Sequence, residues 1–337
     1  MSISTVSRAL NDRPDASDTT REKVRKAASD LGYFANHSGR SLRSGVTGSV
    51  GFVIQTSHSV AEQGDTFFVA VFDGMQSVLS RHQLDLIALL CPSSSDPDEY
   101  VRRVVSRGFV DGLVISYTRR VDPRISFLAE QSVPFVALGR SQTDAGHAWI
   151  DIDFEDIARK SIDLLVGRGH TRIALVSPRD LNYSHVFRSA AEKALQKHGL
   201  SLDPALALRA EGSDAGGYSA ARKVMETDDR PTALIMSSEA MTAGLYRGLL
   251  EADCVPGRDI AVISRDSHST RSLSPALTSF HLNLHELGVA LAEALLATMP
   301  AYRAAYPGGI VRRVFPTRFV HGASDDYAHP LPRPRSI

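Results

Sequence analysis

Short apolar runs alternate with amphipathic segments through most of this chain. Apolar runs that resemble β-strands stand at 48–54, 84–90, 111–116, 134–138, 172–177, 232–237 and 259–264. Segments with helical periodicity stand between many of them, at 69–82, 97–108, 156–167, 185–198 and 239–252. Continuously apolar strands separated by helices are typical of parallel sheets covered on both faces. These strands are too many for a single ordinary sheet. The pattern therefore predicts an α/β fold of two doubly wound lobes with a ligand crevice outside the strand ends.

The two ends of the chain have a different pattern. Near the N-terminus a short helix is expected around residues 4–11, and a second helix is expected to open at Asp18 or Thr19 as its N-cap. The buried stripe expected on this second helix consists of Val24, Ala27, Ala28 and Leu31. Residues 323–337 are polar and rich in proline, which predicts a disordered tail.

Composition and charge restrict the possible partners. The 337 residues carry 38 basic and 38 acidic side chains, so the chain as a whole has no general affinity for nucleic acid. Residues 1–47 are locally basic, with eight Lys or Arg against five Asp or Glu, and any DNA contact is expected there. No apolar run reaches the roughly 20 residues of a membrane span, and no signal-peptide core is present, so a cytoplasmic location is expected and no membrane contact.

The N-terminal motifs resemble one known family. The string TVSRALN at 5–11 is followed by TREKVRKAASDLGY at 20–33 and by the spacing Asn36, Arg40, Leu42. This combination is similar to the lactose-repressor (LacI/GalR) family of helix-turn-helix repressors, and the resemblance continues to about residue 322. It implies a DNA-binding headpiece at 1–35, a hinge helix at 36–47 and an effector domain that is similar to periplasmic binding proteins. In that domain it implies a first lobe of 48–148 plus 282–308 and a second lobe of 149–279 plus 309–322.

The resemblance assigns roles in DNA binding to the headpiece and hinge. In the family, the helix that carries TVSR enters the major groove. The matching base-reading candidates are Ile3, Ser4 and Arg8. The matching phosphate-contacting candidates are Thr5, Ser7 and Asn11. The hinge candidates are Asn36, Arg40 and Leu42, of which Leu42 matches the leucine that opens a minor-groove step; the alternative for Leu42 is an exposed linker residue.

One departure from the family pattern concerns the first helix of the helix-turn-helix. Family headpieces begin with a further helix and turn before the recognition helix, whereas this chain begins at Met1 directly at the turn. The headpiece is therefore expected to be truncated and all-α, through a start codon placed too far downstream or a clipped chain. The alternative is a sugar-binding sensor that has lost DNA binding.

The resemblance also places ligand candidates in the loops at the strand ends. These candidates are Phe67, Phe68, Arg140, Asn182, Tyr183, Arg188, Glu239 and Asp266. Aromatic faces stack on sugar rings, and Arg and Asp side chains suit vicinal hydroxyl groups. Simpler interpretations are ordinary core for the two phenylalanines, a surface ion pair for Arg188 and a loop cap for Asp266. Trp149 is interpreted as core, with stacking in the cleft as the alternative, and the pair Asp151 and Asp153 as lobe-linking structure.

Other classes of function lack support in the sequence. Motifs of nucleotide-binding loops, metalloproteases and nucleophile elbows are absent, so an enzyme is not expected. His268, His281 and His285 are too scattered to predict a metal site, and no cofactor is expected. The resemblance implies a homodimeric repressor that binds double-stranded operator DNA and a small sugar. The segment 122–141, with its Gly139-Arg140 pair, is similar to α-glucoside-type repressors, which favours a glucose-containing disaccharide.

Overall fold

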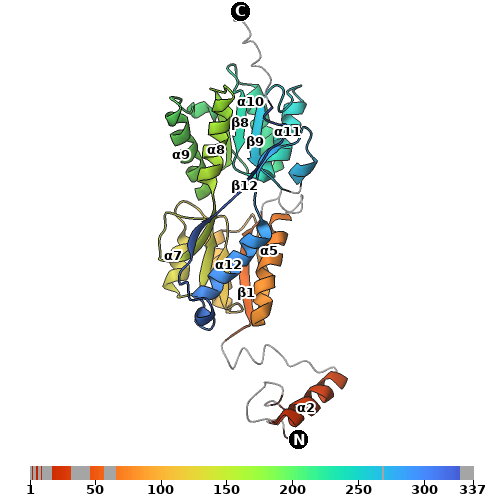
Figure 1. The fold of residues 1–337 in the computed structure, drawn as a ribbon. Helices are drawn as coiled ribbons and strands as arrows, with labels where there is room; N and C mark the ends of the chain where they lie inside the picture. The colour runs from red at the N-terminus through yellow and green to blue at the C-terminus, as the bar shows by residue number, and fades with distance from the viewer. Residues whose placement is uncertain are drawn as a thin grey trace, which may run out of the picture. The chain divides into compact units, whose positions relative to one another are not determined.

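The computed structural model describes residues 2, 5–6, 9, 17–31, 46–56, 66–267 and 269–326. The chain divides into two compact units, residues 1–48 and residues 49–337 (Figure 1). The small unit contains α2 (Asp18–Asp30), whose buried Val24 packs on Ala9 and Val6.

Two expectations for this helix are wrong. Its N-cap is Ser17, whose hydroxyl accepts a hydrogen bond from the backbone N–H of Thr20, so that Asp18 and Thr19 already lie inside the helix. Of the expected apolar stripe only Val24 is buried, and Leu31 is 82% exposed. The reason is that the described part of this small unit buries one turn of the helix and leaves its end uncovered.

The large unit contains two six-stranded sheets, as the apolar runs predicted. The first has the order β11-β5-β4-β3-β1-β2, and all its strand pairs are parallel. Its strands are β1 (Ser49–Gln55), β2 (Asp85–Cys91), β3 (Gly112–Ile115), β4 (Phe135–Leu138), β5 (Ala148–Ile152) and β11 (Arg312–Phe315). The second has the order β12-β10-β9-β8-β6-β7, in which only β12 runs antiparallel to its neighbour. Its strands are β6 (Ile173–Pro178), β7 (Ala207–Ala210), β8 (Ala233–Met236), β9 (Ala261–Arg265), β10 (Thr278–His281) and β12 (Arg318–Val320).

Helices cover both sheets, and the predicted fold of two doubly wound lobes is confirmed (Figure 1). The helices of the first lobe are α5 (Thr66–Leu79), α6 (Pro97–Arg107), α7 (Pro123–Glu130) and α12 (Leu284–Thr298). Those of the second lobe are α8 (Phe154–Gly167), α9 (Asn182–Lys197), α10 (Asp214–Met225) and α11 (Thr242–Leu250). Short 3-10 turns are η1 (Ser80–His82), η2 (Pro204–Leu206), η3 (Glu239–Met241), η4 (Ser269–Ser272) and η5 (Arg303–Ala305).

Glycine allows α5 and α12 to pack unusually closely. A Cβ atom at Gly74 would lie 2.0 Å from the carbonyl oxygen of His285, and one at Gly288 would lie 2.1 Å from that of Val71. No side chain fits in either place, so both positions require glycine. The pair connects the helix that follows β1 with the helix that returns to the first lobe near the end of the chain.

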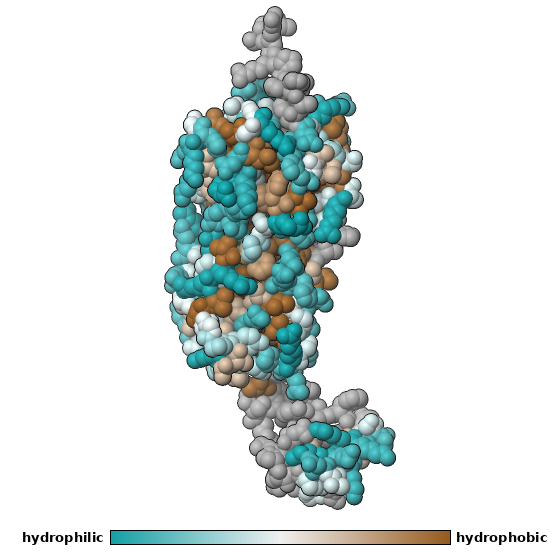
Figure 2. Space-filling model, viewed as in Figure 1, coloured by the Kyte–Doolittle hydropathy of each residue, from teal (hydrophilic) through white to brown (hydrophobic). Residues whose placement is uncertain are grey.

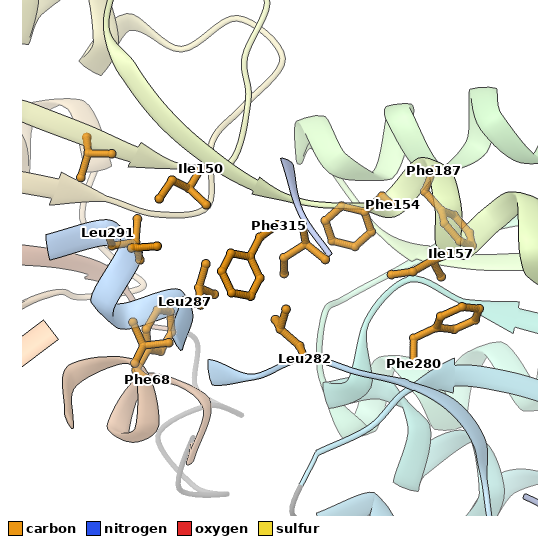
Figure 3. Close-up of a cluster of buried hydrophobic side chains, with 14 of the residues drawn as sticks. Phe68, Ile150, Phe154, Ile157, Phe187, Phe280, Leu282, Leu287, Leu291 and Phe315 are labelled. Atoms are coloured by element: carbon orange, nitrogen blue, oxygen red, sulfur yellow. The ribbon is translucent and has the colours of Figure 1, made fainter. Parts of the chain in front are cut away.

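The chain crosses between the lobes three times; the crossing near residue 282 lies where it was expected, and the other two differ from the expected boundaries. β5 was expected to open the second lobe, but it lies in the first sheet, and the first crossing follows it at Asp153. The return near residue 309 also comes too early, because residues 312–315 pair in parallel with residues 149–152. Figure 3 shows the apolar side chains near these crossings, among them Phe315, Leu282 and Phe154. Apolar packing thus runs continuously from one lobe to the other.

The expected disordered tail begins too early. Ser324 and Asp325 are fully buried in the second lobe. The Ser324 hydroxyl accepts from the backbone N–H of Thr278, and its backbone carbonyl accepts from that of Val262. The Asp325 carboxylate forms an ion pair with Arg168 at 2.8 Å. Residues 323–326 therefore belong to the folded lobe, while 327–337 lie outside the described residues. Within the described part of the chain, every helix is too short or too polar to span a membrane.

Candidate functional site

The two lobes meet through backbone hydrogen bonds beside the carboxyl ends of their strands. The N–H of Asn182, the first residue of α9, donates to the carbonyl of Thr118 in the loop after β3, at 3.0 Å. Next to it, Arg119 and Leu181 form an isolated antiparallel bridge. Parallel sheets bind ligands at this edge, so the side chains around the junction make up the candidate site.

Arg265 lies at the centre of this junction. It is the last residue of β9, and only 7% of it is exposed. Its Nη2 pairs with the carboxylate of Glu239, which opens η3 after the neighbouring strand β8. Its guanidinium carbon lies 5.9 Å from the centre of the Phe67 ring in the first lobe and 5.5 Å from that of Phe154 in the second. Arg265 thus contacts both lobes.

The hydrogen bonding of Arg265 is incomplete. In the described part of the molecule its Nε and Nη1 are buried and have no hydrogen-bond partner. Burial opposes the charged guanidinium, but the Glu239 carboxylate outweighs this effect and holds the pKa of Arg265 above its ordinary value. The side chain therefore stays charged and retains two buried donors. A buried donor without an acceptor costs about 1–3 kcal/mol, so water or a ligand is expected to satisfy it.

Aromatic rings line the surroundings of this guanidinium. Tyr183 stacks on Phe154 with ring centres 4.5 Å apart and an interplanar angle of 10°. Burial raises the pKa of the Tyr183 hydroxyl, although the nearby Arg265 charge works in the opposite direction. Phe67 is partly buried beside Phe68, whereas Phe68 itself belongs to the first-lobe core. Of the two phenylalanine candidates, Phe67 is the one that faces Arg265.

Arg140 forms a second charged network, next to the first crossing. Its Nε donates to Asp151 at 2.7 Å and its Nη2 to Glu155 at 2.7 Å. Burial lowers its pKa, but these two carboxylates outweigh that effect and raise it above the ordinary value. Burial raises the pKa of Asp151, and the Arg140 charge only partly opposes it. The guanidinium also lies 5.7 Å from the ring centre of Trp149.

Asp266 lines a separate pocket of about 300 Å³. Its carboxylate lies 2.9 Å from Nδ1 of His281 and 3.8 Å from Nη2 of Arg271. Ala70 of α5 and Leu284 of α12 come from the first lobe, so this pocket also lies between the lobes. Asp266 is adjacent to Arg265 in the chain, but its carboxylate does not pair with that guanidinium in the structure.

No ion pair joins the remaining candidates to Arg265 among the described residues. Arg188, in α9, is 38% exposed at its side chain and pairs with Glu192 one turn later, at 2.7 Å. The side chain of Asn182 is buried at the start of the same helix. His281 contacts Asp266 and His285 contacts Asp73, so these histidines have separate partners. Among the described residues no group of three potential metal ligands comes together.

Most of the DNA-binding candidates lie outside the described residues, namely Ile3, Ser4, Ser7, Arg8, Asn11, Asn36, Arg40 and Leu42. Thr5 is described. Its hydroxyl lies 2.8 Å from that of Ser2, and its backbone N–H donates to the Ser2 carbonyl. Ser2 therefore begins a helical turn at the position where the short first helix was expected.

Sequence reasoning missed Arg265, Phe154 and Glu155. A signal for Arg265 was present, because it ends a buried strand and the neighbouring strand β8 is followed by Glu239. Two charges of opposite sign at the ends of adjacent parallel strands lie at the edge where ligands bind.

Two family models match parts of this chain. The model described as periplasmic binding protein-like domain matches residues 162–324. The model described as bacterial regulatory proteins, lacI family, matches residues 1–36.

Two curated relatives match most of the chain. The HTH-type transcriptional regulator AglR of Rhizobium meliloti (strain 1021) is 32% identical over 307 residues, covering 88% of this chain and 84% of the relative. The HTH-type transcriptional regulator RafR of Escherichia coli is 33% identical over 301 residues, covering 81% of this chain and 85% of the relative.

Solved structures share the fold. A lac repressor dimer bound to operator and the anti-inducer ONPF has a TM-score of 0.80 at 23% identity, covering 96% of both chains. A complex of the transcriptional regulator CelR with cellobiose has a TM-score of 0.73 at 24% identity, covering 95% of both chains.

Proposed function

Since the chain belongs to the lacI family of bacterial regulatory proteins, we propose that it represses transcription and that a small neutral carbohydrate, bound between its two lobes, changes its affinity for operator DNA. It is a DNA-binding regulator of transcription and not an enzyme. In this proposal residues 1–35 contact the major groove, residues 36–47 form the hinge, and the remaining chain to residue 322 is the effector domain. The DNA-contacting residues are those that match the family pattern, from Ile3 to Asn11 and from Asn36 to Leu42.

The balance of charge at the lobe junction supports a neutral ligand. Every guanidinium named there already faces a carboxylate: Arg265 faces Glu239, Arg140 faces Asp151 and Glu155, and Arg271 faces Asp266. These three arginines therefore leave no unpaired positive charge of their own to select a phosphate or a carboxylate. Polar donors and acceptors next to the rings of Phe67 and Tyr183 suit instead a ring that carries several hydroxyl groups. This balance is the observation that carries the proposal.

An α-glucoside is the proposed effector. The segment 122–141 is similar to α-glucoside-type repressors, and its end supplies Arg140 at the first crossing. The residues proposed to contact the sugar are Phe67, Phe68, Arg140, Asn182, Tyr183, Arg188, Glu239 and Asp266. The CelR structure is a complex with cellobiose, a β-linked disaccharide, so cellobiose is the natural comparison ligand.

The proposed mechanism couples lobe closure to DNA binding. Three chain crossings permit hinge motion, and the hydrogen bond from Asn182 to Thr118 joins the lobes at the strand ends. Two copies pair and present two headpieces to a near-palindromic site. Sugar binding changes the position of the lobes and thereby the spacing at which the hinge segments order on DNA. The sugar must bind the two states with different affinity, or it shifts nothing.

Exposed apolar side chains in the first lobe support pairing. Val69 on α5, Leu90 on the edge strand β2 and Val121 before α7 are each more than half exposed. Figure 2 shows hydrophobic groups interspersed among hydrophilic ones on the visible face. Such side chains are available to the partner copy in a homodimer.

Fluorescence anisotropy of a labelled duplex from the region upstream of the gene tests the proposal. The salt concentration is held fixed, because phosphate contacts dominate affinity. We expect tight binding that maltose, sucrose or trehalose changes at least fivefold, with a smaller effect of cellobiose. Tight binding that none of these sugars alters would contradict the effector class, and binding no tighter than to an unrelated duplex would contradict the repressor.

A further inference from the structure

Positive charge without balancing carboxylates gathers at one side of the lobe junction. Arg120 follows β3 in the first lobe, and Arg209 lies near the end of β7 in the second lobe. Both side chains are exposed, and neither forms an ion pair with a carboxylate of the described residues. By contrast, Arg119, the residue before Arg120, pairs with Asp98. Two arginines therefore remain whose charge the described part of the protein does not neutralise.

The alternation of side chains along β7 directs Arg209 toward α9. Leu208 and Ala210 pack with the core that contains residues of α10 and α11. Because successive side chains of a strand point to opposite faces, Arg209 points to the other face of the sheet. The register agrees, since Arg209 lies level with Ser177 of β6, and Leu175, two residues earlier, packs in the core that contains residues of α9. Arg209 therefore lies on the α9 side of the second sheet.

A bridge between the lobes brings Arg120 to the same helix. Arg119 and Leu181 form an isolated antiparallel bridge, immediately before α9 begins. In such a pairing the next residue of the first lobe, Arg120, lies opposite Asp180 of the second. The carbonyl of Arg120 accepts a hydrogen bond from the backbone N–H of Gln142 at 2.8 Å, which fixes its backbone. Arg120 is thus held beside the start of α9.

His185, in the first turn of α9, lies where these charges converge. Burial lowers the pKa of its imidazole. Three positive charges act on this pKa in the same direction, those of Arg209, Arg120 and Arg188. The carboxylate of Asp180 acts against them, and the first turn of α9 contains no acidic residue. An imidazole and two unpaired guanidinium groups, contributed by both lobes, therefore come together with little negative charge around them.

We propose that Arg120, His185 and Arg209 form a binding site for a doubly charged tetrahedral oxyanion of the phosphate type. A guanidinium binds phosphate oxygens through paired N–H groups, and a protonated imidazole donates a further hydrogen bond. A tetrahedral anion carries enough oxygens to accept from all three side chains at once. Inorganic phosphate and the phosphate group of a phosphorylated metabolite share this chemistry.

This anion site is separate from the crevice proposed for the sugar. The order β9-β8-β6-β7 places the end of β7 three strand spacings from Arg265, about 14 Å across the sheet. Arg265 and Arg140 each face a carboxylate, whereas Arg120 and Arg209 do not. A neutral ligand between the lobes and an anion at the β7 edge of the junction are therefore compatible.

An anion held by both arginines links the two lobes. Arg120 belongs to the first lobe, whereas Arg209 and His185 belong to the second. A ligand that binds one arrangement of the lobes better than another shifts the population toward it. The anion is therefore expected to stabilise the arrangement in which Arg119 and Leu181 are bridged, and through it to change the affinity for the proposed sugar.

The test is isothermal titration calorimetry of the full chain with sulfate and with inorganic phosphate, at an ionic strength held constant with chloride. Arg120→Gln and Arg209→Gln each remove an exposed guanidinium without an ion pair, so both variants are expected to remain folded, which circular dichroism checks. We expect each substitution to weaken the binding of both anions at least fivefold. Glucose 1-phosphate distinguishes the sources, because a phosphorylated metabolite predicts that it binds more tightly than inorganic phosphate.

Arg303→Gln is the matched control. Arg303 is exposed in η5, beyond the far end of α12, and this helix leads about 22 Å away from the junction. The control variant should reproduce the wild-type anion affinity. Equal losses in Arg303→Gln and Arg209→Gln would reveal general charge attraction and overturn the proposal. Absence of saturable binding of both anions to the wild-type protein would also overturn it.

The pH dependence of sulfate binding tests the part of His185. Sulfate does not titrate between about pH 5.5 and 7.5, whereas a bound anion favours the charged imidazole. We expect sulfate to bind at least threefold more tightly at the lower pH in the wild-type protein. His185→Gln should remove this dependence, and a variant that retains it would contradict the proposed site.

The affinity for maltose with and without saturating sulfate tests the link between the lobes. We expect sulfate to change it at least threefold in the wild-type protein and to leave it unchanged in Arg209→Gln, whose maltose affinity without sulfate should be normal. Equal affinities in the wild-type protein would overturn the link. A protein that binds sulfate but no sugar contradicts the proposed sugar-binding function and leaves the anion site standing.

Discussion

Two buried arginines, one in each lobe, show how differently the same side chain is used. Arg124, at the start of α7, is 2% exposed and binds Asp122 through Nε at 2.9 Å and Nη2 at 2.7 Å. Its Nη2 also donates to the carbonyls of Ser116 and Tyr117. Arg265 is almost as buried but has a single carboxylate partner and two nitrogens without acceptors among the described residues.

The difference separates structural from ligand-binding polar groups. The network of Arg124 closes on itself and fixes the loop that carries Tyr117 and Thr118 to the lobe junction. The network around Arg265 instead leaves two buried nitrogens without an acceptor among the described residues. Buried polar groups are normally satisfied by protein atoms or ordered water, so two buried donors without a protein acceptor at the junction are available to a water molecule or a ligand.

The largest effect is expected from breaking the closed network. Arg124→Met leaves the fully buried Asp122 carboxylate without its main partner, which costs about 3–5 kcal/mol of unfolding free energy. Urea unfolding followed by circular dichroism measures the loss. Arg172→Met, which removes partly exposed ion pairs with Asp203 and Asp229, should cost less than about 1 kcal/mol. An Arg124 variant as stable as this control would show that the two arginines do not differ in the way described.

Replacement of both Arg265 and Glu239 is expected to leave the stability of the protein largely unchanged. The double variant Arg265→Met, Glu239→Met replaces both charges by apolar side chains, a change that is often neutral or stabilising by about 1–4 kcal/mol. Stability is therefore expected to stay within about 1 kcal/mol of the wild type or to rise, while sugar affinity is lost. Urea unfolding and calorimetry on the same preparation measure both. A double variant destabilised as much as Arg124→Met would make Arg265 a structural residue.

Acid should affect the closed network in a predictable direction. Burial raises the pKa of Asp122, but Arg124 and Arg119 outweigh it and hold the pKa below its ordinary value. Because the unfolded carboxyl takes up its proton first, the stability that Asp122 contributes is complete above about pH 4 and is lost as pH falls through the lower folded pKa. Asp122→Asn should lower stability at pH 7 and flatten its decline below about pH 4. A decline as steep as in the wild type would count against this role.

Asp151 is expected to change stability with pH in the opposite direction to Asp122. Its folded pKa is raised by burial, so its contribution to stability is largest below the unfolded pKa and decreases as pH rises through the folded value. Asp151→Asn should therefore raise the free energy of unfolding above about pH 4, whereas Asp122→Asn should lower it in the same range. Unfolding between pH 3 and 7 compares the two variants directly.

The smallest effect on stability is expected at a third arginine, which is exposed. Arg188 pairs with Glu192 across one turn of α9, and exposed pairs of this kind contribute about 0.3–0.5 kcal/mol. Arg188→Gln should leave stability unchanged within about 0.5 kcal/mol. If Arg188 contacts the effector as proposed, calorimetry should show sugar binding weakened about tenfold. Unchanged affinity would show that Arg188 does not contact the sugar and forms only the surface ion pair with Glu192.

The strand pattern allowed the fold to be predicted from the sequence, because strands buried on both faces have a strong and simple signal. β1, β2 and β9 were expected within a residue or two of their observed ends. The crossing points were less predictable. Phe315 and its neighbours were assigned to the second lobe, and only pairing with β5 places them in the first. A four-residue strand whose partner lies more than 150 residues away carries no local signal of its sheet.

The candidate site was only partly predictable for a related reason. Phe67, Tyr183 and Glu239 come together around Arg265, which was itself missed because a charged residue at a strand end is ordinarily solvated. Arg188 was chosen from its match to a family position, but its observed partner is a residue on its own helix. Motifs give the residue types near a ligand, whereas the direction of each side chain depends on packing between distant segments.

Reciprocal linkage tests most directly whether sugar binding at the lobe junction and DNA binding are thermodynamically coupled. Calorimetry measures the affinity for maltose with and without a saturating operator duplex, at the salt concentration of the anisotropy experiment. The operator must change the sugar affinity by the same factor by which maltose changes the operator affinity. We predict equal factors of at least five in the wild-type protein. A maltose affinity that is identical with and without the duplex would contradict the account.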